Sequence, residues 1–320
     1  MIPTKRHHGH KGLTIMTWNI YFGADLTPLI NTTPEEVPEA VTEVFNQVVQ
    51  TDFPARAKAI AKQICLADPD LIGLQEVALW TVQSAASTQI ISFLKTLLKE
   101  LRRRGLYYGV IAVNKNFRNQ LPSSTGDIVG LLDRDVILAK CHTPMMLSNI
   151  QEHHYQTNLV VPVGNEPFTI LRGWSSVDIH LCHEKFRLVN THLESESQDI
   201  RFAQAKELIK RAGDTNLPLV LIGDYNTNAE GTASPTYDML IKKGFTDAWQ
   251  VAGQGSGFTA AQARDLLNKV STLSERIDLI LYNKGFCVCR INTIGNKQRN
   301  RTPNGLWPSD HAGVVATLIL

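Results

Sequence analysis

The chain has 320 residues and a formal net charge of +2, from 32 lysine plus arginine and 30 aspartate plus glutamate. Hydrophobic residues make up 43% and charged residues 19%, a composition typical of globular proteins, which excludes an intrinsically disordered chain. The near-balance of charge also excludes a strongly basic coat for nucleic acid, although a local basic groove stays open. Without repeats or linkers, the sequence predicts one domain over residues 12–320, after a flexible tail over residues 1–11.

No apolar run approaches the roughly 20 residues that span a bilayer, so no integral membrane segment is expected. The polar start lacks the apolar core of a secretory signal, and the default expectation is a cytoplasmic protein, or a secreted one if a leader was removed. His7, His8 and His10 are expected to lie in a solvated tail rather than to hold a metal. The five cysteines are odd in number and scattered, which favours a reducing compartment, and Cys287 and Cys289 are expected to be small buried hydrophobes.

In the first half of the chain, apolar spacing predicts strands and helices in alternation. The prolines after Ala24 predict an irregular segment that becomes helical before Asp52. A basic run before Gly105 suits the end of a helix. The predicted strands are 13–20, 71–77 and 109–113, and the helical stripes run over 57–64 and 90–101.

In the second half, predicted strands outnumber predicted helices, but the helices are spread between them. This order favours a layered α/β fold with a mixed sheet over a regular parallel repeat. The predicted strands are 135–138, 168–171, 177–181, 186–193, 218–223, 277–281 and 312–320, and the helices are 200–211 and 235–243.

Six short segments place carboxylates, amides or histidines at the ends of these apolar strands. A buried carboxylate is costly unless it is paired or binds a cation. One such segment is explained by a helix cap, a turn or a salt bridge. Six together indicate a functional site, because strand ends are where layered α/β folds gather their sites. The segments are 17–19, 74–77, 190–194, 223–226, 275–278 and 309–311.

The donor types in these segments indicate which cation would bind. Asn19, Glu76, Asp224, Asn226 and Asp310 offer hard oxygen atoms without clustered thiolates, a set that favours Mg²⁺ or Mn²⁺ over Zn²⁺. Protein-bound Mg²⁺ normally meets a phosphate, and neighbouring histidines can donate to phosphate oxygens or exchange protons near neutral pH.

In order along the chain, these motifs resemble the endonuclease/exonuclease/phosphatase superfamily, the deoxyribonuclease-I-like fold. The resemblance extends from Leu13 to Leu320. It implies a four-layer α/β sandwich, two packed mixed β-sheets flanked by helices, and metal-dependent hydrolysis of a phosphoester. The matching residues are Asn19, Gln75-Glu76, Thr191-His192-Leu193, Gly223-Asp224-x-Asn226, Arg276-Ile277-Asp278 and Ser309-Asp310-His311.

The resemblance assigns a role to each oxygen donor. Glu76 is expected to be the principal metal carboxylate, with Asn19 and Asp310 completing the surroundings of the metal, directly or through water. Asp224 matches the residue that orients or deprotonates the attacking water. Asn226 is expected to hydrogen-bond the phosphoryl oxygens as charge builds there.

The resemblance also implies roles for two histidines. Asp278 is expected to hold His311 in one tautomer, so that His311 contacts the scissile phosphate. His192 matches the second histidine, which contacts the phosphate or assists the leaving group. Which histidine acts as acid, base or electrostatic clamp stays open.

Two further residues are expected to bind substrate. Arg172 is the nearest residue for a phosphate contact, with an ordinary strand-end arginine as its alternative. Trp307 is a candidate to stack on a base or head group, and a role in covering the end of the sheet is the slightly favoured alternative. Many nucleases of the superfamily carry an active-site tyrosine, and none can be assigned here.

Three substrate classes remain. A phosphodiesterase or nuclease ranks first. The best evidence for the basic groove that a nuclease needs is the group of Lys297, Arg299 and Arg301. A sphingomyelinase-like lipid phosphodiesterase ranks second; no long aromatic hairpin is visible, although Leu26–Ile30 is partly apolar. A phosphoinositide or small-molecule phosphatase lacks the dense lysine cluster it would need. The protein is expected to be a monomeric enzyme whose activity depends on Mg²⁺. A binding scaffold without catalytic activity is the alternative from a different functional class.

Overall fold

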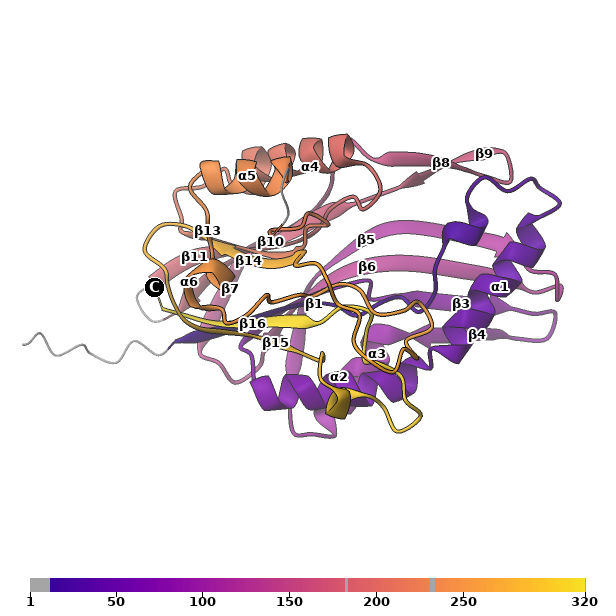
Figure 1. The fold of residues 1–320 in the computed structure, drawn as a ribbon, viewed down its shortest axis with the longest axis horizontal. Helices are drawn as coiled ribbons and strands as arrows, with labels where there is room; N and C mark the ends of the chain where they lie inside the picture. Colours follow the sequence, from indigo (N-terminus) through magenta and orange to yellow (C-terminus); the bar gives the residue numbers. More distant parts are fainter. Residues whose placement is uncertain (1–11, 182–183, 231–233, 320) are drawn as a thin grey trace, which may run out of the picture.

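The computed structural model describes residues 12–181, 184–230 and 234–319. Predictions for residues 1–11, including the tail and its histidines, and for Cys182 lie outside this range. Two mixed β-sheets pack face to face with helices on their outer faces (Figure 1), so the predicted four-layer α/β architecture is confirmed. None of the described helices is both long and apolar enough to span a bilayer.

The larger sheet runs in the order β15-β16-β1-β2-β6-β3-β4, and β5 pairs with the other side of β6. In its centre, β1 pairs in parallel with β2, and Asn19 lies opposite Gln75. Its strands are β1 (Leu13–Asn19), β2 (Leu71–Gln75), β3 (Leu79–Gln83), β4 (Thr88–Ser92), β5 (Tyr108–Pro122), β6 (Ile128–Lys140), β15 (Cys287–Ile294) and β16 (Gly313–Ile319).

The second sheet runs in the order β13-β14-β12-β11-β10-β7. Its strands are β7 (Met145–His154), β10 (Gly173–Leu181), β11 (Glu184–His192), β12 (Leu219–Asp224), β13 (Thr246–Asp247) and β14 (Asp278–Tyr282). A separate hairpin of β8 (Leu159–Val163) and β9 (Glu166–Ile170) extends beyond this sheet toward the N-terminal end of α1 (Figure 1).

The helices and the core define the layers. Aliphatic side chains from the inner faces of both sheets, such as Ile15, Ile137 and Ile222, form the central core. A second core lies under α1, α2 and α3, and a third lies under α4 and α5. The helices are η1 (Thr27–Leu29), α1 (Val37–Gln50), α2 (Phe53–Ala67), α3 (Phe93–Arg102), α4 (Gln198–Arg211), α5 (Pro235–Lys242), α6 (Ala248–Ala252) and η2 (Gln298–Asn300).

The structure corrects the helix predicted over 90–101. Ile90 and Ile91 belong to strand β4, which suits their β-branched side chains, and the helix begins after Ser92. The Ser92 hydroxyl accepts a hydrogen bond from the Lys95 amide at 3.3 Å, which caps α3. The sequence analysis also did not predict β3, β4, β7, β8 or β15.

The expectation of buried cysteines at 287 and 289 is wrong. Cys287 and Cys289 are exposed on β15, which lies at the edge of the larger sheet and has solvent on one side. A register irregularity between Val288 and Arg290 interrupts the regular alternation of faces there.

Candidate active site

Strand register brings the predicted site residues of the second sheet together. His192, the last residue of β11, lies opposite Asp224, the last residue of β12. Asp224 in turn lies opposite Asp278, the first residue of β14. Three polar side chains that are far apart in the sequence therefore meet at one end of the sheet.

The two sheets approach each other closely beneath this end. The buried Gln75 amide donates to Asn190 Oδ1 at 2.7 Å, which joins the two sheets by a hydrogen bond. A Cβ at Gly73 would lie 2.4 Å from Asn190 Oδ1, so only glycine permits this approach. Polar residues from β1 and β2 consequently face those from β11 and β12.

Asp224 is the centre of the cluster. Its Oδ2 lies 3.1 Å from the Asn19 amide nitrogen, 3.5 Å from His192 Nε2 and 3.8 Å from His311 Nε2. Its Oδ1 accepts a hydrogen bond from the Asn226 backbone amide at 3.0 Å. Burial, and then the neighbouring Asp278 carboxylate, raise the pKa of Asp224 to about 6, so it is mostly ionised at neutral pH.

The two histidines have opposite electrostatic surroundings. Arg172 Nη1 lies 2.9 Å from His192 Nδ1, and because arginine only donates, Nδ1 must accept. His192 is therefore neutral with its proton on Nε2, and burial followed by the Arg172 charge holds its pKa well below the usual range.

His311 has the opposite protonation state. Its Nδ1 lies 2.8 Å from Asp278 Oδ2. Although burial lowers it, the pKa of His311 is raised well above its usual range by the carboxylates of Asp278, Asp310 and Asp224. His311 is therefore an imidazolium at neutral pH, and its Nε2–H faces Asp224.

Glu76 and Asp310 are a second set of carboxylates beside the cluster around Asp224. Glu76 Oε1 accepts from the Asn19 amide at 3.0 Å and Oε2 accepts from the Phe22 backbone amide at 2.9 Å. Burial, and then the Asp310 carboxylate, raise the pKa of Glu76 to about 8. Burial also raises the pKa of Asp310. Two buried carboxylates with raised pKa values suit a bound cation, which would offset the cost of burying their charge.

The Asn19 side chain lies between Glu76 and Asp224, and its amide oxygen accepts from the Tyr21 backbone amide at 3.0 Å. Its nitrogen faces Glu76 and Asp224. The predicted contact of Asn19 with a metal requires its oxygen, so that contact stays a prediction. A separate group of Asp224, Asp278 and His311 has ligand atoms within 4.8 Å of one another. In that group, Asp278 and His311 are already hydrogen-bonded to each other.

A buried acidic pair supports the site and was missed by the sequence analysis. Asp133 and Asp135 on β6 are fully buried, and both accept from the Asn116 amide at 2.9 Å. Asp135 also accepts from the Glu76 backbone amide, where Glu76 has a φ of 58°. Because this left-handed conformation is unfavourable for a residue with a Cβ, the hydrogen bond helps to fix the Glu76 backbone.

Arg172 completes this buried network. Its guanidinium is charge-coupled to both Asp133 and Asp135 and donates to His192. Arg172 also lines the cavity that holds the site, and its Nε has no protein partner among the described residues. Because this Nε atom is itself buried, the phosphate contact of Arg172 stays a prediction.

Arg56 on α2 is a second residue that the sequence analysis missed. Its fully buried guanidinium donates to the backbone carbonyls of Ile20, Tyr21, Thr51 and Pro308, at 2.8 to 3.1 Å. Three of these carbonyls, those of Ile20, Tyr21 and Pro308, belong to the segments that follow Asn19 and precede Asp310. Burial lowers the pKa of Arg56 to about 10, so it remains a cation beneath the carboxylates.

The prediction that Trp307 stacks on substrate is wrong. Its side chain is 0% exposed and packs with Tyr21, Leu266 and Leu306. The indole nitrogen donates to the Asn268 carbonyl at 2.9 Å, and the Arg301 guanidinium covers the ring at 5.3 Å. The alternative of a packing role for Trp307 is the one that the structure supports.

Asn226 lies where the prediction places it, at the end of β12 beside Asp224. Its backbone is left-handed, with a φ of 49°, and its side-chain amide donates to the Leu193 carbonyl at 2.9 Å. Arg201 donates to the Asn226 carbonyl and so fixes this turn from α4. The second amide hydrogen of Asn226 remains for the cavity.

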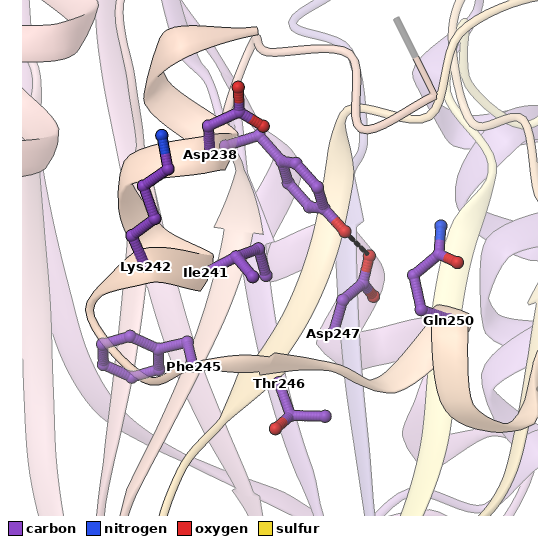
Figure 2. A pocket seen from close by; sticks show the side chains of 8 residues that line it. Asp238, Ile241, Lys242, Phe245, Thr246, Asp247 and Gln250 are labelled. Atoms are coloured by element: carbon purple, nitrogen blue, oxygen red, sulfur yellow. Dashed lines mark hydrogen bonds between the residues drawn. The ribbon is translucent and has the colours of Figure 1, made fainter.

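The site residues line one cavity of about 470 Å³, from Glu76, Arg172 and His192 to Asp310 and His311. A second cavity, of about 380 Å³, lies beside α5 and α6 (Figure 2). There the Tyr237 hydroxyl donates to Asp247 at 2.9 Å, and Arg276 forms an ion pair with Asp247 at 2.6 Å. The motif residue Arg276 therefore stabilises the second sheet and does not face the first cavity.

Comparison with solved structures relates this fold to known proteins. A mannosyl-6-phosphatase of Bacteroides thetaiotaomicron is 18% identical, with a TM-score of 0.57 over 96% of this chain and 100% of that one. TDP2 of D. rerio, in complex with a single-strand DNA product, is 16% identical, with a TM-score of 0.59 over 97% and 99%. A Leptotrichia buccalis family protein is 16% identical, with a TM-score of 0.61 over 96% and 100%. These likenesses establish a common fold.

Comparison with curated proteins finds no match. The sequence profile of the Endonuclease/Exonuclease/phosphatase family matches residues 16–311, which include every strand end described above. The order of the site residues along the chain, the packed sheets and this match agree. The chain belongs to the endonuclease/exonuclease/phosphatase family of phosphoester hydrolases.

Proposed function

We propose that this protein is a Mg²⁺-dependent phosphodiesterase that directs water onto a phosphodiester, with Mn²⁺ as an alternative ion. The observation that supports this most directly is the position of Asp224, an ionisable carboxylate between a neutral and a charged histidine. Hydrolysis of a phosphodiester needs an oriented water and positive charge near the phosphoryl oxygens. This cluster supplies groups of both kinds.

Asp224 is assigned to orient the attacking water and accept its proton. With a pKa of about 6, it is ionised at neutral pH and basic enough to take part in proton transfer. The Asn226 backbone amide fixes its Oδ1, while its Oδ2 accepts from the Asn19 amide and faces both histidines. Asn226 is assigned to donate its free amide hydrogen to a phosphoryl oxygen.

The two histidines are assigned different tasks because their protonation states differ. His311, a cation held by Asp278, stabilises negative charge on the phosphoryl oxygens. His192 is neutral and offers one Nε2–H to the phosphate or the leaving oxygen. Arg172 supports the His192 tautomer and adds a positive charge at the cavity wall.

Glu76 and Asp310 are assigned to hold the metal, with Asn19 as the third donor. Their oxygen atoms and their pKa values, which burial raises, suit a hard divalent cation. When bound, such a cation polarises a phosphoryl oxygen and offsets developing negative charge. Arg56 and Asp135 position the backbone segments that carry these donors.

A hydrolysis screen tests the proposal with plasmid DNA, sphingomyelin and bis(4-nitrophenyl) phosphate, each with Mg²⁺ and with EDTA. Turnover of at least one substrate is expected to require the metal and to fall about 100- to 1000-fold in His311→Ala. Equal turnover in EDTA, or in His311→Ala, would contradict the assignment. Absence of turnover on all three, with Mg²⁺ bound, would favour a phosphomonoester substrate or the binding scaffold.

A further inference from the structure

The cavity that holds the site has two chemically different ends. One end carries the catalytic groups, and the other is lined almost entirely by apolar side chains. The apolar end is lined by residues of η1, α1, β3, β5, β6 and the β8–β9 hairpin, among them Leu29, Val44, Trp80, Leu131, Val161 and Ile170. Because apolar surface around open space is unfavourable in water, a continuous lining of this kind indicates a site for an apolar group.

The β8–β9 hairpin forms the roof of the apolar end. Val161 pairs with Phe168 in the hairpin, and both side chains are half-buried, whereas the neighbouring Val160 is 56% exposed on the outer face. Phe168 packs edge-to-face on Phe117 of β5, with ring centroids 5.8 Å apart. The hairpin thus contacts the larger sheet across the cavity.

The tip of the hairpin is fixed to the segment before α1. The Asn31 amide donates to the Pro162 carbonyl at 2.9 Å, and the Asn165 amide donates to the Thr32 carbonyl at 3.1 Å. Gly164 donates its amide to the Thr32 hydroxyl at 3.1 Å. The hairpin is therefore held at its tip by the segment before α1 and along β9 by the contact of Phe168 with Phe117 (Figure 1).

The charges around the cavity disfavour a long polyanion. Apart from the site carboxylates, Asp25, Glu196 and Glu275 line the cavity, and the lining arginines are Arg172 and Arg264. Arg264 is paired with Asp25, so its charge is offset. The basic residues expected to serve a nuclease, Lys297, Arg299 and Arg301, do not line it. One phosphate with an apolar substituent fits these walls better than a nucleic acid.

We propose that the apolar end binds an unbranched aliphatic chain carried by the phosphoester, so that the substrate is a single-chain amphiphilic phosphoester. This rests on the proposed function, since the phosphate lies at the catalytic groups while the chain lies under the hairpin. The lining is mainly aliphatic, and a volume of about 470 Å³ belongs to the class of sites that take one small ligand. One chain therefore fits better than two.

Calorimetric titration of wild-type protein with Mg²⁺ tests the proposal without catalysis. The ligands are inorganic phosphate and butyl, hexyl, octyl and decyl phosphate, below their micelle concentrations. The Kd is expected to fall about three- to fourfold for each added methylene until the cavity is filled. The heat-capacity change on binding should become more negative over the same series. A Kd that does not depend on chain length would overturn the proposal.

Two neighbouring valines on β8 provide a matched pair of variants. Val161→Gln places an amide in the apolar end and is expected to raise the Kd of decyl phosphate about tenfold. Val160→Gln makes the same change on the outer face, where the Kd should stay within twofold. Leu131→Gln, on the opposite wall, repeats the test away from the hairpin. Equal effects of the two valine variants would contradict binding under the hairpin.

Hydrolysis separates this inference from the proposed function. The substrates are methyl and decyl 4-nitrophenyl phosphate, compared by kcat/KM. Chain-dependent binding without hydrolysis of either ester would overturn the proposed function and support the chain site. Hydrolysis of both at the same kcat/KM would overturn the chain site and support the proposed function. Tighter binding of benzyl phosphate than of heptyl phosphate would overturn the assignment of an aliphatic chain.

Discussion

Two groups of buried carboxylates in this protein differ in how they are compensated. The site carboxylates, Glu76, Asp224 and Asp310, have raised pKa values and face a cavity. The structural carboxylates, Asp178 and Asp247, each form a short ion pair with a buried arginine, at 2.6 Å to Arg187 and Arg276. Both groups lie at or near strands of the sheets, so burial alone does not distinguish them.

The way in which its desolvation is offset distinguishes a functional buried carboxylate from a structural one. A carboxylate paired with arginine has its desolvation offset inside the protein. A carboxylate whose pKa is raised by burial and by other carboxylates is left to be compensated by something outside the chain, such as a cation. The following predictions test whether the two groups behave as differently as their surroundings.

Asp224→Asn should give the largest effect. Because the variant removes the proposed base, kcat/KM for the phosphodiester is expected to fall about 1000-fold. The free energy of unfolding at pH 7 should stay constant or rise, since folding raises the pKa of Asp224 and so disfavours its ionised form. Rate assays and urea unfolding measure the two quantities. A large loss of stability would place Asp224 among the structural carboxylates.

Arg276→Met should show the opposite behaviour. It leaves the Asp247 charge buried without its arginine, which is expected to lower the free energy of unfolding by about 3 kcal/mol. The kcat/KM of the folded protein should stay within about threefold, because Arg276 contacts Asp247 and Glu230 rather than a site group. The double variant Arg276→Met/Asp247→Asn removes the unpaired charge. Its unfolding energy should exceed that of Arg276→Met, and a lower value would contradict the ion-pair explanation.

Cation binding should stabilise the protein through the site carboxylates. At one hundred times its Kd, Mg²⁺ is expected to raise the free energy of unfolding by about 2.7 kcal/mol. Glu76→Gln should remove most of this gain, whereas Asp278→Asn should retain it, because Asp278 is engaged by His311. Urea unfolding with Mg²⁺ and with EDTA measures the gain in each variant. The reverse order would place the cation at the cluster of Asp224, Asp278 and His311.

The sequence located the polar residues at the strand ends better than it predicted the elements around them. Asn19, Glu76, His192, Asp224 and their partners follow apolar strands, and this local contrast is visible in the residue order. The edge strand β7 lacks such a signal because it is half polar. In the hairpin, β9 overlaps the predicted strand 168–171, whereas Pro162 interrupts the apolar run of β8 and weakens its strand signal. The two sheets were predicted from the resemblance, whereas strand pairing depends on contacts distant in sequence.

The missed and misassigned residues have the same physical explanation. Asp133 and Asp135 lie inside β6 rather than at its end, so the criterion used for the six segments did not select them. Arg56 lies on a helix as an ordinary polar residue, and its carbonyl partners are distant in sequence. Trp307 precedes a site motif, but only packing against Tyr21 and Leu266 determines that its ring faces inward.

The acid dependence of Asp178 gives the smallest predicted effect. Although burial raises it, hydrogen bonds from Arg187 and Asn149 lower the pKa of Asp178 below its usual range. A lowered folded-state pKa stabilises the protein above the unfolded-state pKa of about 3.9, and this contribution is lost as the pH falls through the folded-state value. The loss of stability in Asp178→Asn should therefore be constant from pH 7 to about 5 and shrink below about 4. Urea unfolding across this range measures it, and a loss that grows toward acid would assign Asp178 to the same class as the site carboxylates.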